Sequence, residues 1–388
     1  MDFTIPEEMK MLQLTARRFT NEVLMPLERE YVTHDLLPFE VEKDLEERVK
    51  AMGMWALSVP SEFGGGGVGP LGMWLLEEEV NRALLGDRHQ SRGFEGEPLS
   101  LYYECNDEQK QKYFYPIIRG EKNSGFFGQT EPNAGSDPAS METTAVRQGD
   151  HYTINGQKAF MCSPWGGTHV DWEYGCILAV TDKEKRGRGG ITAFIVDRDT
   201  PGFKIGRSYE TIGGCITCDL HFEDARVPVE NRIGEEGQGF ILGQKWLQAT
   251  RLSSAASAVG IADRALEMSA RHAKGRFTFG QPIASRQAIQ WMLADSAVEI
   301  HACRVMGYHG SWKAEVGRDI RQESAYLRLY SAEMVGRVLD RAIQVHGAYG
   351  TTKDLPLGKM WRSVRHMRLG HGTAEIQRFI IARNLLRD

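Results

Sequence analysis

The sequence predicts an α+β protein built in three parts: a helical domain, an all-β domain and a helical bundle. Three observations support this order. Apolar residues recur with helical spacing near the start, short apolar runs alternate with turn residues in the middle, and a long helical stripe returns near the end. We place the three domains at residues 1–120, 121–235 and 236–388.

The first part has the period of amphipathic helices. Met9, Leu12, Ala16 and Phe19 follow one another at spacings of three and four residues, which places them on one helix face. Further helices are expected over residues 45–52, 71–85 and 107–118, the last with Asp107 as its N-cap.

The middle part changes to the pattern of strands. Asn155-Gly156 lies inside the segment His151–Lys158, and because Asn-Gly favours the positive φ angles of a type I′ turn, we predict a hairpin turn there. Short apolar runs at 177–180, 191–196 and 220–222 predict further strands.

Helical spacing returns after Gly239 and predicts a bundle. One long predicted helix has its apolar stripe at Leu327, Tyr330, Met334, Val338, Ala342 and Val345.

Composition excludes several classes of protein. With 41% hydrophobic and 26% charged residues the chain is globular, and a formal net charge of −5 argues against nucleic acid as the main partner. No apolar run reaches the ~18–20 residues of a membrane helix. The start, MDFTIPEEMK, lacks a signal pattern, so a cytoplasmic protein is expected, with an organelle matrix after leader removal left open. Six cysteines are too few for a disulfide scaffold.

Two short motifs favour an ordinary structural role. Residues 67–72 match GxGxxG, but Pro70 lies in the turn and no alternating strand–helix units follow, so we favour a glycine-rich loop over a dinucleotide site. Cys215-Ile-Thr-Cys218 is a single CxxC without a second pair of ligands, so we expect no metal there.

Three polar segments are better candidates for a site. QTEPNAGSD (129–137) packs hydroxyls and backbone donors into nine positions, which suits a phosphate or the polar edge of a planar cofactor, although a polar turn is an equal alternative. RFTFGQP (276–282) offers a guanidinium between two helices, and GHGTAEIQR (370–378) is a turn into the last helix.

Together these segments resemble the acyl-CoA dehydrogenase family, and IQVHGAYG, NGQK and FEDARVP add to the resemblance in the right order. The resemblance implies an N-terminal helical domain, a middle β-barrel domain and a C-terminal four-helix bundle. It also implies a homotetramer that uses FAD, acts on an acyl-CoA thioester and passes electrons to an electron-transferring flavoprotein.

The resemblance assigns residues to the cofactor and the substrate. The expected FAD contacts, some of them across a subunit interface, are Gln129, Thr130, Ser136, Phe160, Cys162, Arg276, Phe279, Gln287, Gln344, Gly347, Thr373 and Glu375. Cys162 stands where a flavin-bonding threonine is common, and a thiol is a weaker donor. Ser136, Arg251 and Gly372 are expected to contact the acyl-CoA, with Arg251 beneath the active site.

The sequence departs from the family at the catalytic base. The family removes the α-proton with a carboxylate at one of two positions, which here are His371 and Thr250. Three hypotheses follow: His371 is the base, Glu95 or Glu97 reaches in from a neighbouring loop, or no α-proton is abstracted in this way.

The segment 87–97 is unusually cationic for a place that resembles the end of the acyl pocket. Arg88 and Arg92 could pair with a carboxylate or sulfinate on the acyl tail, although a solvated loop is an equal alternative. Three functions therefore stay open: desaturation of a short, polar or branched acyl-CoA, a non-desaturating reaction such as desulfination or another elimination, and a non-catalytic flavin-binding partner.

Overall fold

The computed structural model describes residues 4–31, 37–85, 94–123, 125–162, 173–214 and 216–386. The chain divides into two compact units. The helical unit comprises residues 1–37, 68–88 and 248–388, and the sheet unit comprises residues 38–67 and 89–247.

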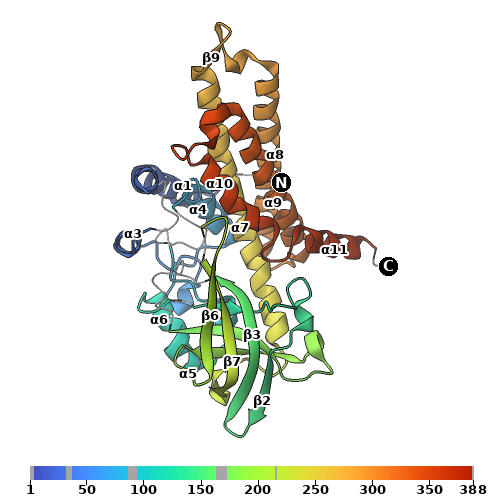
Figure 1. Cartoon of the computed structure of the whole chain (residues 1–388). Coiled ribbons are helices and arrows are strands. Elements are labelled where there is room, and N and C mark those ends of the chain that lie inside the picture. The colour runs from blue at the N-terminus through green and yellow to red at the C-terminus, as the bar shows by residue number, and fades with distance from the viewer. Residues whose placement is uncertain are drawn as a thin grey trace. The chain divides into compact units, whose positions relative to one another are not determined.

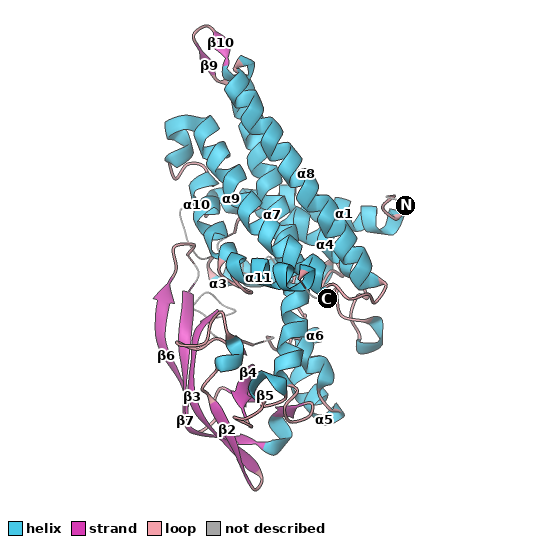
Figure 2. Cartoon of the chain, turned by 90° about the vertical axis from the view of Figure 1, so that its right-hand side faces the viewer, coloured by secondary structure: helices cyan, strands magenta, loops and turns pink. Residues whose placement is uncertain are grey.

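The helical unit contains α1 (Glu7–Phe19), α2 (Met25–Glu30), α4 (Pro70–Val80), α8 (Gln287–Glu315), α9 (Arg321–His346), α10 (Leu357–Val364), α11 (Ala374–Leu385) and most of α7 (Gly239–Gly275). Figure 2 shows α7, α8 and α9 side by side, with the hairpin of β9 (Phe277–Thr278) and β10 (Gln281–Pro282) at one end. Long helices form here because Leu327, Met334 and Val338 of the predicted stripe are buried against a common core.

Two features lock α4 into this helical unit. Gly307 of α8 leaves room for the Trp74 indole, since a Cβ there would lie 2.1 Å from a ring carbon. The buried Glu78 also accepts a hydrogen bond from Arg304 Nε at 2.8 Å. Apolar contact and a buried ion pair therefore hold the same helix.

The sheet unit holds one eight-stranded sheet in the order β6-β7-β3-β2-β4-β5-β8, with β1 beside β4. Its strands are β1 (Phe127–Gly128), β2 (Thr144–Gln148), β3 (His151–Cys162), β4 (Tyr174–Val180), β5 (Ile191–Asp197), β6 (Phe203–Glu210), β7 (Ile216–Pro228) and β8 (Arg232–Ile233). Figure 1 shows the long strands β2, β3, β7 and β6 in sequence across the sheet. Short helices α3 (Phe39–Ala51), α5 (Asp107–Gln109) and α6 (Tyr115–Ile118) complete the unit.

The prediction of a hairpin turn at Asn155-Gly156 was wrong. Both residues lie inside β3, and the chain reverses at Gly149-Asp150 between β2 and β3, where Gly149 has φ 66°. Gly156 instead marks a register shift against β7, and a Cβ there would lie 2.6 Å from Thr143 Cα. Close approach of Thr143, the residue before β2, therefore explains this glycine.

Of two local predictions at helix starts, one changes and the other agrees with the structure. Asn106, not Asp107, caps α5, because its side chain accepts from the Gln109 backbone while the Gln109 side chain accepts from the Asn106 backbone. The GxGxxG segment leads into α4 with Gly69 as its N-cap, and no strand precedes it between residues 37 and 68. The preferred interpretation as a loop, rather than a dinucleotide site, agrees with this geometry.

Candidate functional site

A buried ion pair anchors the loop that contains Gln129 and Thr130. Lys158 on β3 is fully buried, and its Nζ donates to Glu131 Oε1 at 2.6 Å. Glu131 also accepts from the backbone N–H groups of Glu142 at 2.5 Å and Thr143 at 3.0 Å. Burial lowers the pKa of Lys158 to about 8, whereas the Lys158 charge and these donors hold the pKa of Glu131 below its usual range against burial. Both groups are therefore charged at neutral pH.

The loop and β3 together present groups that fit a planar polar ligand. The backbone N–H of Ala159 donates to the Thr130 carbonyl at 2.9 Å, which brings Thr130 beside Phe160. Phe160 has φ 56° and is 62% exposed, and its ring lies 5.6 Å from the Tyr209 ring. Gln129 Oε1 is buried without a hydrogen-bond donor in the described structure. The loop and β3 thus offer an exposed aromatic ring and an unsatisfied buried acceptor, two groups that suit a flavin ring system.

Ser136 and Cys162 lie on the same unit as this loop. Ser136 is exposed, in a stretch from Gly135 to Asp137 that is open to solvent. Cys162 ends β3 and pairs with Thr217 of β7, but its side chain lies outside the description. The contact expected of its thiol stays a prediction.

The hairpin β9–β10 presents exposed groups at the end of the helical unit. Arg276 is exposed, and Phe279 is 97% exposed with φ 48°. Arg286 supports the hairpin, because its guanidinium donates to the Thr278 carbonyl at 3.0 Å and lies 5.8 Å from the Phe279 ring. A phenyl ring held outward in this way is available to a ligand or a second chain.

The ends of α7 and α9 lie side by side below this hairpin. The rings of His272 and His346 stack at 4.4 Å, which places Gln344 and Gly347 near the start of the Arg276 segment. Gln344 is exposed, and Gly347 ends α9 with φ 62°. Gln287, the first residue of α8, is also exposed. The structure thus brings five of the predicted FAD residues, Phe279 of the hairpin included, to one end of the helical unit.

The turn Gly370-His371-Gly372 has a strained and firmly held backbone. His371 has φ 55° and Gly372 has φ 88°, and the left-handed region is unfavourable for histidine. Arg328 Nη2 donates to the Gly370 carbonyl at 2.7 Å, and Arg251 Nε donates to the His371 carbonyl at 3.0 Å. Gln377 Nε2 donates to the His371 and Gly372 carbonyls at 3.3 and 2.9 Å.

All three donors to this turn are buried. Arg328, Arg251 and Gln377 are 1%, 6% and 0% exposed. Burial lowers the pKa of Arg251 to about 10, so its guanidinium is still charged at neutral pH. Within the described part of the chain no carboxylate forms an ion pair with Arg251. The turn therefore lies in a cationic setting.

The His371 ring meets the helix that carries the second expected base position. Its Nδ1 lies 3.5 Å from Ser254 Oγ, and the Ser254 hydroxyl donates to the Thr250 carbonyl at 2.7 Å. Thr250, Arg251 and Ser254 all lie on α7. Thr373 caps α11 by accepting from the Ile376 backbone at 3.3 Å, while hydrogen bonds from the backbone and Thr373 lower the pKa of the exposed Glu375.

Two further candidates for the base, Glu95 and Glu97, belong to the sheet unit, and their assignment as the base stays a prediction. Glu97 Oε1 accepts from the Ser58 backbone at 3.2 Å, and the Glu95 carbonyl accepts from the Ala56 backbone at 2.7 Å, both within the sheet unit. Arg88 and Arg92 lie outside the described residues. Reasoning from the sequence missed Ser254, Arg328 and Gln377. Only Ser254 had a signal, since it follows Thr250 by four residues, one helical turn.

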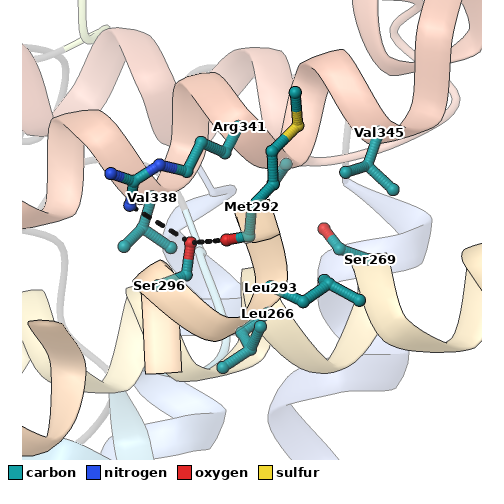
Figure 3. A pocket seen from close by; sticks show the side chains of 9 residues that line it. Leu266, Ser269, Met292, Leu293, Ser296, Val338, Arg341 and Val345 are labelled. Atoms are coloured by element: carbon teal, nitrogen blue, oxygen red, sulfur yellow. Dashed lines mark hydrogen bonds between the residues drawn. The ribbon is translucent and has the colours of Figure 1, made fainter. Parts of the chain in front are cut away.

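The cavity among α7, α8 and α9 is too small for a cofactor. Its volume is about 10 Å³, room for about one water molecule. Figure 3 shows Arg341 reaching Ser296, whose hydroxyl bonds the Met292 carbonyl at 2.7 Å. Among the described residues, no three His, Cys, Asp or Glu side chains gather as a metal site. No described helix is both long and apolar enough to cross a membrane.

Three family models match consecutive parts of the chain. The acyl-CoA dehydrogenase N-terminal domain matches residues 6–121, the middle domain matches residues 127–225 and the C-terminal domain matches residues 237–386. The chain belongs to the acyl-CoA dehydrogenase family. The resemblance stated from the motifs is thereby confirmed.

Individual relatives of this acyl-CoA dehydrogenase family member agree over full length. (R)-Benzylsuccinyl-CoA dehydrogenase of Thauera aromatica is 37% identical, with 100% of this chain and 98% of the relative covered. Butyryl-CoA dehydrogenase of Megasphaera elsdenii has a TM-score of 0.88 at 30% identity, with both chains fully covered. PigA with FAD and proline has a TM-score of 0.89 at 26% identity, with 99% of each chain covered. The predicted fold class is confirmed.

Proposed function

We propose that this chain is an FAD-dependent acyl-CoA dehydrogenase that introduces an α,β double bond into a short, polar or branched acyl-CoA, with His371 as the base. The observation that carries this proposal is the turn at residue 371. Three buried donors hold the strained turn 370–372, and the family resemblance places a catalytic carboxylate at its central position, which here is His371. A strained backbone conformation that several hydrogen bonds hold in place is typical of functional residues.

The residues of the sheet unit are proposed to hold the flavin ring. Gln129 and Thr130 offer polar contacts, Phe160 offers an aromatic face, and the Lys158–Glu131 pair keeps their loop in place. Cys162 is a weaker donor than a threonine. FAD held by these residues would supply an acceptor for the hydride that leaves the β-carbon of the substrate.

The exposed groups of the helical unit are proposed to bind the rest of FAD. Arg276 supplies a cation for phosphate, and Phe279, Gln287, Gln344 and Gly347 lie around the same end of α7, α8 and α9. The family resemblance places part of this contact across subunits of a homotetramer. Thr373 and Glu375, at the start of α11, are assigned to the pyrophosphate end.

His371 is proposed to accept the α-proton of the thioester. The electron pair of the broken α-C–H bond forms the new double bond as the hydride leaves the β-carbon. As the α-proton leaves, negative charge develops on the thioester oxygen, and the buried cation Arg251 stabilises this charge. Ser136, Gly372, Arg88 and Arg92 are assigned to substrate binding, the two arginines to an anionic acyl tail. An electron-transferring flavoprotein is the expected electron acceptor.

A second candidate is a non-desaturating reaction, such as elimination of a sulfinate. One observation favours it: neither His371 nor Thr250 is a carboxylate, so both usual positions of the base have changed. A flavin-binding partner without catalysis is the third candidate.

The deciding experiment is anaerobic mixing of the purified yellow protein with butyryl-, isobutyryl-, succinyl-, glutaryl- and 3-sulfinopropionyl-CoA. We expect one thioester to bleach the flavin absorbance and to give its 2-enoyl product by mass spectrometry. His371→Ala should slow that bleaching at least ~100-fold, in the range for loss of a general base.

The other outcomes separate the candidates. CoA products that change without bleaching would support elimination instead. Bound FAD with neither bleaching nor products for any thioester would favour the non-catalytic partner. Bleaching by His371→Ala at the original rate would show that another group is the base.

A further inference from the structure

The hydroxyl of Ser254 has a fixed direction. Ser254 is fully buried on α7, and its hydroxyl donates to the Thr250 carbonyl one turn earlier at 2.7 Å. A serine hydroxyl carries one hydrogen and two lone pairs. Since the hydrogen is used toward Thr250, Ser254 Oγ can serve a second neighbour only as an acceptor.

That second neighbour is the His371 ring. Its Nδ1 lies 3.5 Å from Ser254 Oγ, although the two residues are 117 positions apart in the chain. An acceptor beside Nδ1 favours the tautomer in which Nδ1 carries the hydrogen. The lone pair of the neutral imidazole then lies at Nε2.

The backbone keeps the ring at this distance. The carbonyls of Gly370, His371 and Gly372 are bound by Arg328, Arg251 and Gln377, so the left-handed turn has little freedom to move the imidazole away from α7. Ser254 also lies on a packed helix, and its side chain cannot adopt another rotamer without breaking its hydrogen bond to the Thr250 carbonyl.

We propose that Ser254 is a positioning residue that holds His371 in the Nδ1–H tautomer and so presents Nε2 as the proton-accepting atom. The inference rests on the proposed function, in which His371 is the base. When Nε2 takes the α-proton, the Nδ1–H···Oγ contact remains, so the same serine orients both the neutral ring and the imidazolium. No hydroxyl needs to turn during the reaction.

The chain offers a conservative variant and a matched control. Ser254→Ala removes the acceptor, and Ser254→Thr keeps a hydroxyl that can donate to the carbonyl four residues earlier. Ser269→Ala is the control, because Ser269 is buried on the same helix and makes the same kind of bond, to the Ala265 carbonyl at 2.8 Å, away from His371.

The first measurement reads the tautomer and needs no turnover. Protein labelled with ¹⁵N-histidine is examined by long-range ¹H–¹⁵N NMR, with His371→Gln used to assign the ring. We expect a protonated Nδ1 in the wild type and in Ser269→Ala, and a shift toward protonated Nε2 in Ser254→Ala. A wild-type ring protonated at Nε2 when neutral would overturn the proposal.

The second measurement follows flavin reduction by the active thioester. We expect Ser254→Ala to lower kcat about 10- to 100-fold, the loss typical when a group that orients a metal-ligating histidine is removed, with KM changed less than about twofold. Ser254→Thr should recover most of kcat, and Ser269→Ala should match the wild type. An unchanged kcat in Ser254→Ala would overturn the positioning role.

Failure of the proposed function would look different. If no thioester reduces the flavin, or if His371→Ala keeps full activity, the assignment of His371 as base fails whatever Ser254 does. The NMR result still decides which nitrogen of His371 carries the hydrogen.

Discussion

Lys158 in the sheet unit and Arg251 in the helical unit are both buried cations, but their surroundings differ. Lys158 is fully buried and has a carboxylate at 2.6 Å, which in turn accepts from two backbone N–H groups. Arg251 is 6% exposed, and its hydrogen bond goes to the His371 carbonyl. Glu131 therefore neutralises Lys158, whereas Arg251 has no carboxylate partner within the residues described.

From this difference we propose that the charge of Lys158 is structural and that the charge of Arg251 is functional. A buried pair that satisfies every polar atom holds a loop, and removing one partner leaves the other charge stranded. A buried cation that binds only carbonyl groups is not neutralised, so its charge can stabilise negative charge that develops on a substrate beside it. The two sites should therefore respond in opposite ways to loss of the cation.

The largest expected effect is on folding stability at Lys158. Lys158→Met leaves Glu131 buried without its cation, so we expect the free energy of unfolding to fall by about 3–5 kcal/mol. Urea unfolding followed by circular dichroism measures this loss. Because Gln129 and Thr130 depend on the same loop, FAD affinity should fall as well.

Two controls make this result specific. Lys204→Met breaks the exposed Lys204–Glu223 pair of the same sheet and should cost less than about 1 kcal/mol. Adding Glu131→Gln to Lys158→Met should recover part of the loss, because it removes the stranded charge. If Lys158→Met alone lowered the free energy of unfolding by less than about 1 kcal/mol, Lys158 and Arg251 would not differ in their contribution to stability.

Glu42 extends the comparison to a buried carboxyl group that forms no ion pair with the residues described. Burial and the neighbouring Glu46 raise the pKa of Glu42 to about 7, and the folded state therefore keeps a proton that the unfolded state has lost. Stability should fall as the pH rises from about 4.5 to about 7. Glu42→Gln should raise stability at pH 8 by up to about 2 kcal/mol and change little near pH 4.

Water limits the change in stability that we expect for Glu42→Gln. The side chain is 6% exposed and lines a hollow of about 400 Å³, where solvent screens part of the charge. Urea unfolding at the two pH values measures the difference, with the exposed Glu47→Gln as control. Equal effects at pH 4 and pH 8 would show that the pKa of Glu42 is the same in the folded and unfolded states.

The smallest expected change in stability is at Arg251. Arg251→Met strands no carboxylate, and Gln377 still donates to the His371 carbonyl, so we expect the free energy of unfolding to change by less than about 1 kcal/mol. Flavin reduction by the active thioester should nevertheless slow at least about 10-fold, because the buried charge and its hydrogen bond to the His371 carbonyl are both lost.

The outcome at Arg251 tests the comparison directly. Arg251→Lys keeps the charge without the planar fork and should fall between wild type and Arg251→Met in rate. A loss of 3 kcal/mol or more with unchanged flavin reduction would make Arg251 a structural cation like Lys158.

Much of the fold could be predicted because its signals are local. The stripe that includes Leu327, Met334 and Val338 lies within one helix, so its period could be read without knowing what it packs against. Asn155-Gly156 misled the prediction for the opposite reason. The dipeptide has a turn preference of its own, but close approach of Thr143 and pairing with β7 place it inside a strand.

The site residues also differ in whether a local sequence signal could predict them. The motifs that include Thr130, Arg276 and Gly347 could be recognised in order, and they assigned the chain to its family before any contact was known. Arg328 and Gln377 carried no such signal. Their importance lies in bonds to the carbonyls of Gly370 and Gly372, and a carbonyl is the same in every residue.

The sequence by itself determined the order of helical and β parts, the family and the loss of a carboxylate at both expected base positions. Only the tertiary structure decided that Ser254 meets His371 and that Glu131 neutralises Lys158. Periodicity and motifs report on residues within a few turns of one another. Contacts across 117 and 27 positions depend on how helices and strands pack, and it is packing that determines the surroundings of each buried charge.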